Sequence, residues 1–266
     1  MSSFSLKVVA LTLRKVLMSE QIVIITGASS GIGQATAQRF TREGATVYNF
    51  DIHAPEDRSG AVWRQCDVLD GPQVHQLVDQ VVIDHGQVDV AIANAGISIR
   101  HPFLEMTDEE VKRVLGINIY GVIHLWQAAG AHMYKAGDGC LLATASTNGN
   151  VGYPWYADYN ASKAAILALS KTVALELAPY VRTACVSPGY VMTPMQRLEY
   201  TDLMLEEVNE TIPAGRHATP NEIASAFYYL ASAEARFITG QQLIIDGGEL
   251  AGGTASRYRT NASGIS

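Results

Sequence analysis

Cysteine is scarce in this sequence. The chain has three cysteines in 266 residues, Cys66, Cys140 and Cys185, and their odd number and wide spacing exclude a disulfide framework and a zinc site. We expect three buried, reduced thiols in a cytoplasmic protein. The seven histidines show no metal-ligand spacing, so no metal is predicted.

Positive charge and long apolar runs are also lacking. Lysine and arginine number 19 against 26 acidic residues, and a net charge of −7 without a basic stripe excludes nucleic acid as a partner. No uninterrupted apolar run reaches the ~18 residues that a membrane span requires, so no membrane partner is predicted. Lys7 interrupts the apolar segment near the N-terminus, and residues 1–20 are expected to be an extension outside the fold.

Hydrophobic residues make up 48 % of the chain, enough for one large core. Short apolar runs alternate with amphipathic segments, which is typical of a parallel sheet covered by helices. The expected strands are 21–26, 45–51, 61–68, 88–93, 140–145, 181–186 and 242–245, and the expected helices are 32–43, 72–85, 107–135, 156–177 and 221–232. The sequence predicts one α/β domain at 21–248, a doubly wound parallel sheet of about seven strands with helices on both faces, followed by a tail at 249–266.

A glycine-rich turn joins the first strand to the first helix. Its sequence, Thr26-Gly-Ala-Ser-Ser-Gly-Ile-Gly33, allows a tight turn and the close approach of a pyrophosphate to the helix N-terminus. The same residues match the Gly-x-Ser-x-Gly elbow of hydrolases, but an elbow follows several strands and only one precedes Gly27. No Lys-Ser/Thr pair follows the glycines, which excludes a P-loop. The turn therefore predicts a dinucleotide cofactor.

An acidic residue, Asp51, ends the second strand 24 residues after Gly27. A carboxylate at this position can accept hydrogen bonds from both ribose hydroxyls of NAD, and it repels the 2′-phosphate of NADP. No lysine or arginine occupies positions 28–30 or 52–53 to receive that phosphate. The alternative is a carboxylate that only caps the loop. We predict NAD as the cofactor.

Further motifs follow the later strands. Asn94-Ala-Gly96 ends the fourth strand, Ser146 follows the fifth, and Tyr159 and Lys163 share one face of the next helix. With the glycine turn, this set resembles the short-chain dehydrogenase/reductase family from about residue 21 to residue 248. The resemblance extends to Asp67-Val68, Asn118, Ser187-Pro-Gly189, Thr193 and Asp246-Gly-Gly248. The chain departs from the family in Ala93-Asn-Ala-Gly, where Asn-Asn-Ala-Gly is frequent.

The resemblance implies a single-domain Rossmann-like fold and hydride transfer between NAD and a small secondary alcohol or its ketone. Tyr159 would be the general base or acid, because Lys163 and the positive nicotinamide lower the pKa of its phenol. Ser146 would hydrogen-bond the substrate oxygen, and Asn118 would hold a water that relays protons to the lysine. The residues assigned to the cofactor are Gly27, Ser29, Ser30, Ile32, Gly33, Asp51, Asp67, Val68, Asn94, Gly96, Tyr159, Lys163, Pro188, Gly189, Val191 and Thr193. Those assigned to the substrate are Ser146, Asn148, Tyr153, Tyr159 and Tyr190.

The segment 190–215 resembles the substrate lid of the family. Its methionines and leucines, among them Met195 and Leu198, favour a moderately apolar, uncharged ligand. Hydroxyl groups at Tyr153 and Tyr190 leave a polyol or sugar open. The resemblance also implies a homotetramer, paired through the helices at 107–135 and 156–177. The small residues expected there are Ala128, Ala129, Gly130, Ala164, Ala165 and Ala168.

Two alternatives stand beside the NAD-dependent oxidoreductase. An NADPH-dependent carbonyl reductase of the same family is disfavoured by Asp51. A non-catalytic nucleotide-binding protein would be expected to have lost Tyr159, Lys163 or Ser146, and all three are present.

Overall fold

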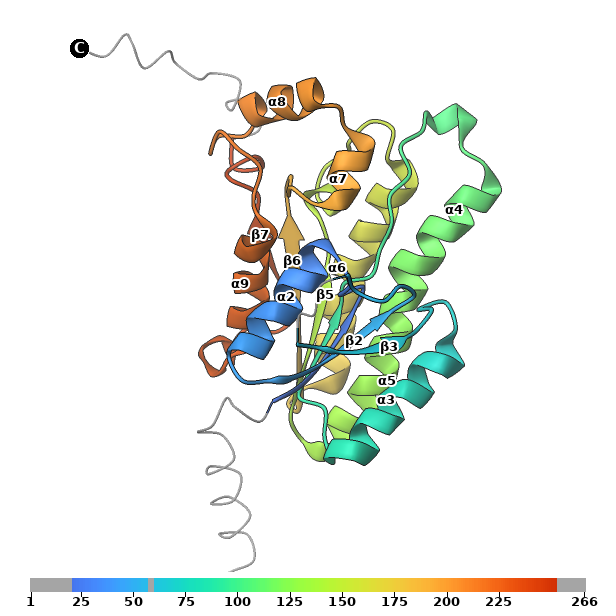
Figure 1. The fold of residues 1–266 in the computed structure, drawn as a ribbon, viewed down its shortest axis with the longest axis vertical. Coiled ribbons are helices and arrows are strands. Elements are labelled where there is room, and N and C mark those ends of the chain that lie inside the picture. The colour runs from blue at the N-terminus through green and yellow to red at the C-terminus, as the bar shows by residue number, and fades with distance from the viewer. Residues whose placement is uncertain (1–20, 57–59, 253–266) are drawn as a thin grey trace, which may run out of the picture.

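One sheet of seven parallel strands forms the centre of the protein (Figure 1). The structure is a computed structural model, and it describes residues 21–56 and 60–252. The strands are β1 Ile22–Thr26, β2 Thr46–Asp51, β3 Val62–Gln65, β4 Val90–Ala93, β5 Gly139–Thr144, β6 Val181–Pro188 and β7 Gln241–Ile245. They lie in the order β3-β2-β1-β4-β5-β6-β7, and every neighbouring pair is parallel. The predicted Rossmann-like doubly wound sheet is confirmed.

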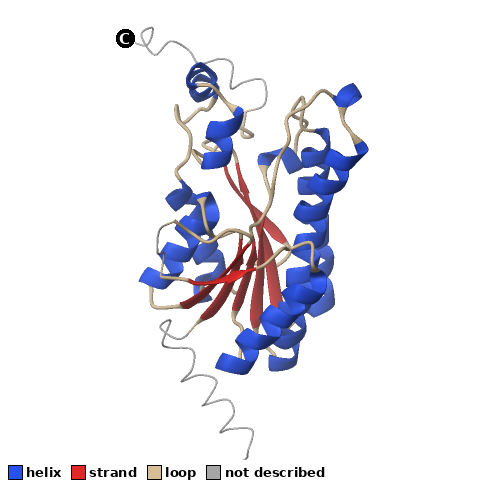
Figure 2. Ribbon diagram, turned by 45° about the vertical axis from the view of Figure 1, so that its right-hand side comes forward, coloured by secondary structure: helices blue, strands red, loops and turns tan. Residues whose placement is uncertain are grey.

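Helices cover both faces of this sheet (Figure 2). On one face lie α2 Gly31–Arg42 and α9 Pro220–Ala231, whose Phe40 and Phe227 are buried in one apolar core. On the other face α3 Gly71–His85, α5 Gly121–Ala136 and α6 Ala157–Leu177 bury a second core. Because both faces are covered, β1 is buried along its whole length, which explains its unbroken apolar sequence.

The direction of chain winding reverses between β1 and β4. These strands are neighbours in the sheet, with Val23 opposite Val90, although β2, β3 and α3 lie between them in the chain. The loops after β1 and β4 therefore diverge at the carboxyl edge of the sheet and leave a crevice, which is where such sheets bind ligands. The glycine turn after β1 and the Asn94 segment after β4 meet at this point.

The helix predicted over 107–135 is divided into three parts. Thr107 begins α4 Asp108–Leu115 with the expected capping box, in which its side chain and that of Glu110 satisfy each other's backbone N–H groups. A π-helical turn follows at Gly116–Tyr120 before α5 begins, and Asn118 lies inside it. Such turns are frequent at functional sites, and sequence periodicity does not reveal them.

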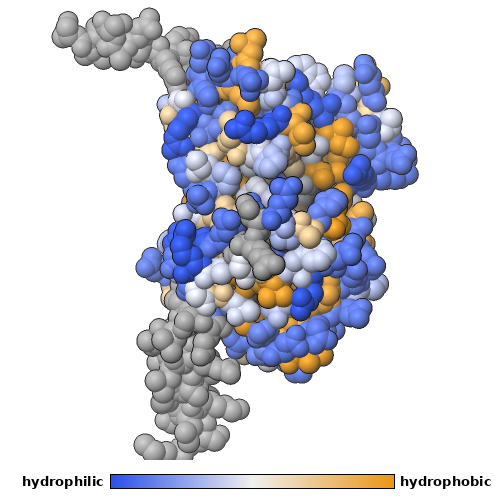
Figure 3. Space-filling model, viewed as in Figure 1, coloured by the Kyte–Doolittle hydropathy of each residue, from blue (hydrophilic) through white to orange (hydrophobic). Residues whose placement is uncertain are grey.

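Two short helices, α7 Pro194–Glu199 and α8 Asp202–Thr211, occupy the predicted lid between β6 and α9. Hydrophilic side chains cover most of the face in Figure 3, and hydrophobic ones form small patches, one of them between α7 and α4. Among residues 21–56 and 60–252, no helix is long and apolar enough to cross a membrane.

The three cysteines are buried, as expected. The small-residue interface was predicted wrongly for α5: Ala128, Ala129 and Gly130 are buried within the subunit, and Gly130 packs beside Leu141 of β5. The predicted extension at 1–20 and residues 253–266 of the predicted tail lie outside the described residues.

Candidate active site

The glycine turn is held against the loop after β4 more tightly than any side chain would allow. Gly27 has a left-handed backbone (φ 67°), and a Cβ atom there would lie 2.8 Å from the Cα atom of Ala95. At Gly33 a Cβ atom would lie 2.2 Å from the carbonyl oxygen of Gly27 and 2.5 Å from Nδ2 of Asn94. Both glycines are therefore required by the close packing of the turn on Asn94 and Ala95.

A buried asparagine that the sequence analysis missed, Asn49 of β2, supports the turn from the other side. Its Oδ1 accepts the N–H of Ala28 at 3.1 Å, and its Nδ2 donates to Oγ of Ser29 at 2.9 Å. Ser29 in turn donates to the carbonyl oxygen of His53 at 2.6 Å. A polar residue within the otherwise apolar β2 was the available signal, since buried polar groups require partners.

The carboxylate of Asp51 lies at the end of β2 and faces the glycine turn. It accepts the N–H of Ser29 at 3.0 Å and the N–H of His53 at 3.0 Å, one on each oxygen. These are the contacts of a loop-capping carboxylate, the alternative weighed from the sequence. Each oxygen retains a second lone pair for a ligand hydroxyl, so the two roles are compatible.

Asn94 ties the carboxyl ends of three central strands together. Its Nδ2 donates to the carbonyl oxygens of Thr26 (3.2 Å) and Gly27 (3.0 Å), and its Oδ1 accepts from the hydroxyl of Thr144 (2.9 Å). Its own N–H donates to the Thr26 hydroxyl at 3.0 Å. The substitution of Ala93 for the frequent asparagine leaves this network in place.

The other predicted cofactor residues surround the same crevice. The N-cap of α7, Thr193, lies beside Gly31 at the start of α2, so the lid begins over the glycine turn. Gly189, after the last residue of β6, donates its N–H to Ile245 at 3.0 Å, and Val191 is buried and bridges to Ala218. At the far end of the crevice, Val68 is buried and Asp67 caps its own turn by accepting the N–H of Leu69 at 2.9 Å.

These residues fit a dinucleotide. The N-cap Ser30 of α2 makes no capping hydrogen bond with its side chain, and the first turn of α2 carries no acidic residue. The N–H groups of that turn are therefore free of side-chain caps and attract an anion such as a pyrophosphate. Ser30 and Ile32 lie in this first turn, while Gly96 faces Lys163 and Asn118 at the catalytic end.

Tyr159, Ser146 and Lys163 come together at the carboxyl edge of β5. Burial raises the pKa of Tyr159 to about 12, against the lowering effect of its hydrogen bond with Ser146, and the negative charge of Glu199 raises it further. Lys163 donates to the carbonyl oxygen of Thr144 at 2.8 Å, and its Nζ lies 5.4 Å from the centre of the Tyr159 ring. Burial lowers the pKa of Lys163 to about 8.

The side chain of Asn118 makes hydrogen bonds to the loop after β4 and to α6. Its Oδ1 accepts the N–H of Ile97, and its Nδ2 donates to the carbonyl oxygen of Ile97, both at 2.9 Å, and to Oγ of Ser162 at 3.0 Å. Both side-chain N–H groups are thus engaged. The π-helical turn aims this side chain at the β4–α4 loop, and its predicted water relay stays a prediction.

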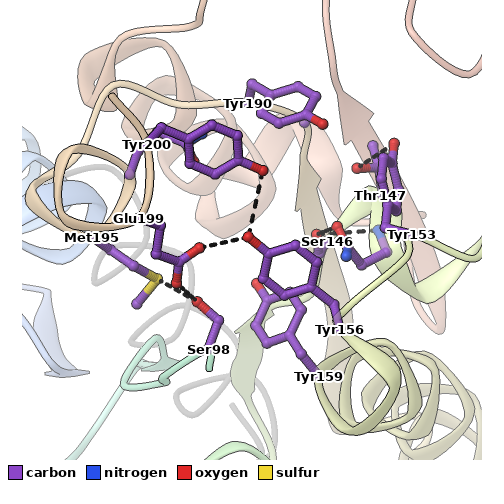
Figure 4. Close-up of a pocket in the computed structure, with 13 residues that line it drawn as sticks. Ser98, Ser146, Thr147, Tyr153, Tyr156, Tyr159, Tyr190, Met195, Glu199 and Tyr200 are labelled. Carbon is purple, nitrogen blue, oxygen red and sulfur yellow. Dashed lines mark hydrogen bonds between the residues drawn. The ribbon is translucent and has the colours of Figure 1, made fainter. Parts of the chain in front are cut away.

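A pocket of about 90 Å³ opens above Tyr159 and Ser146 (Figure 4). The predicted substrate residues Asn148, Tyr153 and Tyr190 line it. Asn148 orients Ser146 by accepting its hydroxyl hydrogen at 3.1 Å, while its own Nδ2 donates to Asn160 at 2.7 Å. The remaining lining residues are Ser98, Thr147, Tyr156, Gly189, Met195, Gln196, Glu199 and Tyr200.

Sequence reasoning missed the two acidic groups at this pocket. Glu199 of α7 accepts hydrogen bonds from Ser98 and, at 2.8 Å, from the hydroxyl of Tyr156. Glu249 accepts a hydrogen bond from the hydroxyl of Tyr153, so the predicted boundary between domain and tail after Gly248 separates this residue from its contacts. Burial raises the pKa of Glu249. Glu199 is one of several acidic residues in the segment 190–215, and no local pattern distinguishes it from the others.

The expectation of an apolar pocket wall is correspondingly wrong. Leu198 is 88 % exposed and does not line the pocket, while Met195 does. Five tyrosines and a glutamate surround the space instead. This lining suits a polar, uncharged ligand better than a hydrocarbon.

Taken together, the doubly wound sheet, the glycine turn and the Ser146–Tyr159–Lys163 group define a nicotinamide-dependent oxidoreductase. The family model described as enoyl-(acyl carrier protein) reductase matches residues 27–249. The chain is 36 % identical over 244 residues to 3-oxoacyl-(acyl-carrier-protein) reductase of Thermotoga maritima, covering 86 % of this chain and 97 % of that protein. It is 37 % identical over 240 residues to the sorbose reductase of Schizosaccharomyces pombe, covering 85 % and 94 %.

A solved structure of a dehydrogenase has the same fold as this chain. The ligand-free aldohexose dehydrogenase of Thermoplasma acidophilum superimposes with a TM-score of 0.83 at 31 % identity, covering 87 % of this chain and 94 % of that one. The chain belongs to the short-chain dehydrogenase/reductase family, and it is an oxidoreductase that acts on alcohols or ketones.

Proposed function

We propose that the protein transfers hydride between NAD and a small, uncharged secondary alcohol or its ketone, with Tyr159 as the general base or acid. The observation that carries this proposal is that Tyr159 and Ser146 line one pocket, with Lys163 buried 5.4 Å from the centre of the Tyr159 ring. A bound nicotinamide cofactor supplies the site that accepts or returns the hydride.

Tyr159 handles the proton of the substrate hydroxyl. Because burial holds its pKa at about 12, the phenol is protonated at neutral pH in the protein alone. A positive charge nearby favours the phenolate, and Lys163, with its Nζ 5.4 Å from the ring, provides one. Tyr159 then accepts the alcohol proton as the hydride leaves, and returns it when the ketone is reduced.

Ser146 positions the substrate oxygen. Its hydroxyl donates to Oδ1 of Asn148 at 3.1 Å and accepts the N–H of Asn148 at 3.2 Å, so it is held in place before substrate binds. When this hydroxyl turns its one hydrogen from Asn148 to the substrate oxygen, it stabilises the charge that develops there. Asn118 is joined to α6 by its hydrogen bond of 3.0 Å with Ser162, the residue before Lys163.

The preference for NAD rests on Asp51. Its carboxylate lies against the turn at Ser29 and His53, and its two spare lone pairs suit a ribose diol. The 2′-phosphate of NADP would place a second negative charge next to the Asp51 carboxylate. NADPH-dependent reduction is the competing function within the family.

Two further features belong to this proposal. We place the protein in the cytoplasm, because its three cysteines are buried free thiols. We also propose a homotetramer, in which the exposed Ala164 and Ala168 of α6 allow close packing against a second copy.

A spectrophotometric screen tests the proposal. Secondary alcohols, polyols and the matching ketones are offered with NAD(H) and with NADP(H), and the near-ultraviolet absorbance of the reduced cofactor is followed. We expect turnover of an uncharged substrate with kcat/KM at least about tenfold higher with NAD, a difference of roughly 1.4 kcal/mol. Equal use of both cofactors would reject the NAD assignment, and a best substrate carrying phosphate or coenzyme A would reject the substrate class.

A further inference from the structure

Two glutamates bind the hydroxyl hydrogens of two pocket tyrosines. Tyr156, at the N-cap of α6, donates to Glu199, and Tyr153 donates to Glu249 beyond the end of β7. Figure 4 shows Glu199 reaching from the lid helix toward the Tyr156 hydroxyl, beside Tyr159. The partners are 43 and 96 residues apart in sequence.

These contacts use the donor hydrogens of both tyrosines and leave acceptor groups for a ligand. A phenol has one donor hydrogen, so Tyr156 and Tyr153 retain only the lone pairs of their oxygens for a ligand. An ionised carboxylate is an acceptor only, and its two oxygens offer about four lone-pair positions. Glu199 has used one of these for Ser98 and one for Tyr156. The part of the pocket formed by Glu199, Tyr156 and Tyr153 therefore offers acceptors, while the buried Nε2 group of Gln196, which lines the same pocket, remains a donor.

A ligand with several hydroxyl hydrogens satisfies such a pocket, whereas a ligand with one leaves acceptors unpaired. Leaving a desolvated acceptor without a partner is costly, and hydrogen bonds to charged groups are the strongest of this kind. Glu199, Tyr159 and Ser146 all line this pocket. The negative charge of Glu199 also disfavours carboxylate and phosphate groups at this position.

We propose that Glu199 is a specificity-determining residue, whose carboxylate accepts a hydrogen bond from a second substrate hydroxyl next to the reacting one. The inference rests on the proposed function, and it selects vicinal diols and larger polyols over alcohols with a single hydroxyl. The carboxylate lines the same pocket as Tyr159, and the ring of Tyr156, which donates to it, has its centre 6.2 Å from that of Tyr159. Ser98 and Tyr156 hold it there from two different walls of the pocket.

If Glu199 only held the lid in place, its replacement would have a different effect. Glu199 is the last residue of α7, so its bonds to Ser98 and Tyr156 also fasten the lid to the pocket walls. A fastening contact affects every substrate by the same factor. A hydrogen bond to a second hydroxyl changes only the ratio between diol and mono-alcohol, so the ratio is the readout.

The experiment compares butane-2,3-diol with butan-2-ol, and cyclohexane-1,2-diol with cyclohexanol, in the full chain and in Glu199→Gln. We expect the ratio of kcat/KM, diol over mono-alcohol, to fall by about ten- to a hundredfold in Glu199→Gln, as for loss of a hydrogen bond to a charged group. Leu198→Ala, on the same helix with an 88 % exposed side chain, is the control and should keep the ratio. Any effect of the lost charge on the pKa of Tyr159 cancels in the ratio.

An equal fall for diol and mono-alcohol would overturn the inference and leave Glu199 as a lid contact. If neither pair is turned over by the parent protein, the proposed function fails on these substrates, and calorimetric binding to the complex with NADH decides the inference separately. Tighter binding of the diol than of the mono-alcohol, lost in Glu199→Gln, would support it. Equal binding of the two in the parent protein would reject it, and thermal unfolding verifies that the variant is folded.

Discussion

The Lys163 ammonium group donates a hydrogen bond to the carbonyl oxygen of Thr144, the last residue of β5, at 2.8 Å. This bond links helix α6 to the carboxyl edge of the sheet. It keeps Nζ buried and 5.4 Å from the centre of the Tyr159 ring. The position of Lys163 beside Tyr159 therefore depends on the sheet as well as on helix α6.

Replacement of the proposed base should abolish turnover without loss of cofactor binding. Tyr159→Phe removes the hydroxyl that exchanges the proton, while the glycine turn and Asp51 are untouched, so kcat should fall by at least about a thousandfold. Cofactor affinity, measured by fluorescence titration, should change by less than about threefold. Tyr134→Phe, in a half-exposed tyrosine that contacts Tyr180, is the matched control. Near-parental activity in Tyr159→Phe would disprove the mechanism.

The buried lysine should lower the stability of the protein at neutral pH. Burial lowers the pKa of Lys163 from 10.5 to about 8, so between pH 8 and 10.5 the unfolded chain holds more protons than the folded one. Stability from this group therefore rises with pH across that window. We expect Lys163→Met to be inactive. Its free energy of unfolding should exceed that of the parent protein most near pH 7, and this difference should decrease by roughly 3 kcal/mol toward pH 10.5.

Denaturant unfolding of the parent and of Lys163→Met at pH 7, 9 and 10.5 checks this prediction. Lys171→Met, on the exposed side of the same helix, is the control and should show no such dependence. A difference between parent and Lys163→Met that does not vary with pH would show that the lysine is not desolvated.

The charge of Asp51 should decide between the two cofactors. Asp51→Ala removes the acceptor for the ribose diol and the repulsion of a 2′-phosphate, so the preference for NAD over NADP should fall by about tenfold or more. Some loss of stability should accompany it, because Ser29 and His53 lose the acceptor of their N–H groups. Ratios of kcat/KM measure the effect, and Asp84→Ala, an exposed residue of α3, serves as the control. An unchanged ratio would assign Asp51 to loop capping alone.

A methyl group at Gly33 should disrupt the cofactor turn. The added Cβ would lie 2.2 Å from the Gly27 carbonyl oxygen, so the turn must move away from Asn94. We expect Gly33→Ala to weaken cofactor binding by at least about tenfold and to lower the melting temperature. Gly152→Ala, where a Cβ would meet no atom within 4 Å, should leave both unchanged. Equal cofactor affinity in the two variants would contradict the tight packing of the turn.

Local sequence patterns predicted most of the fold correctly. The apolar run of β1 and the glycine at the C-terminal end of α3, Gly86 with a left-handed backbone, are each recognisable within a few residues of chain. The Thr107 capping box is likewise local. The π-helical turn at Asn118 was not predicted, because its hydrogen-bond pattern is set by the backbone and no residue type marks it in the sequence.

The sequence by itself determined which residues are proposed to carry the chemistry, and only the tertiary structure decided which groups the pocket presents to a substrate. Tyr159 and Lys163 are one helical turn apart, so their common face follows from helix geometry alone. Glu199 meets Ser98 from 101 residues away, and Glu249 meets Tyr153 from 96 residues away. Contacts at such separations arise where loops from different strands converge at the edge of the sheet, and no local pattern contains them. Whether a tyrosine hydroxyl donates its hydrogen depends on which acceptor lies beside it in space. The sequence therefore could not show that Tyr156 and Tyr153 donate to glutamates and leave only acceptors for a ligand.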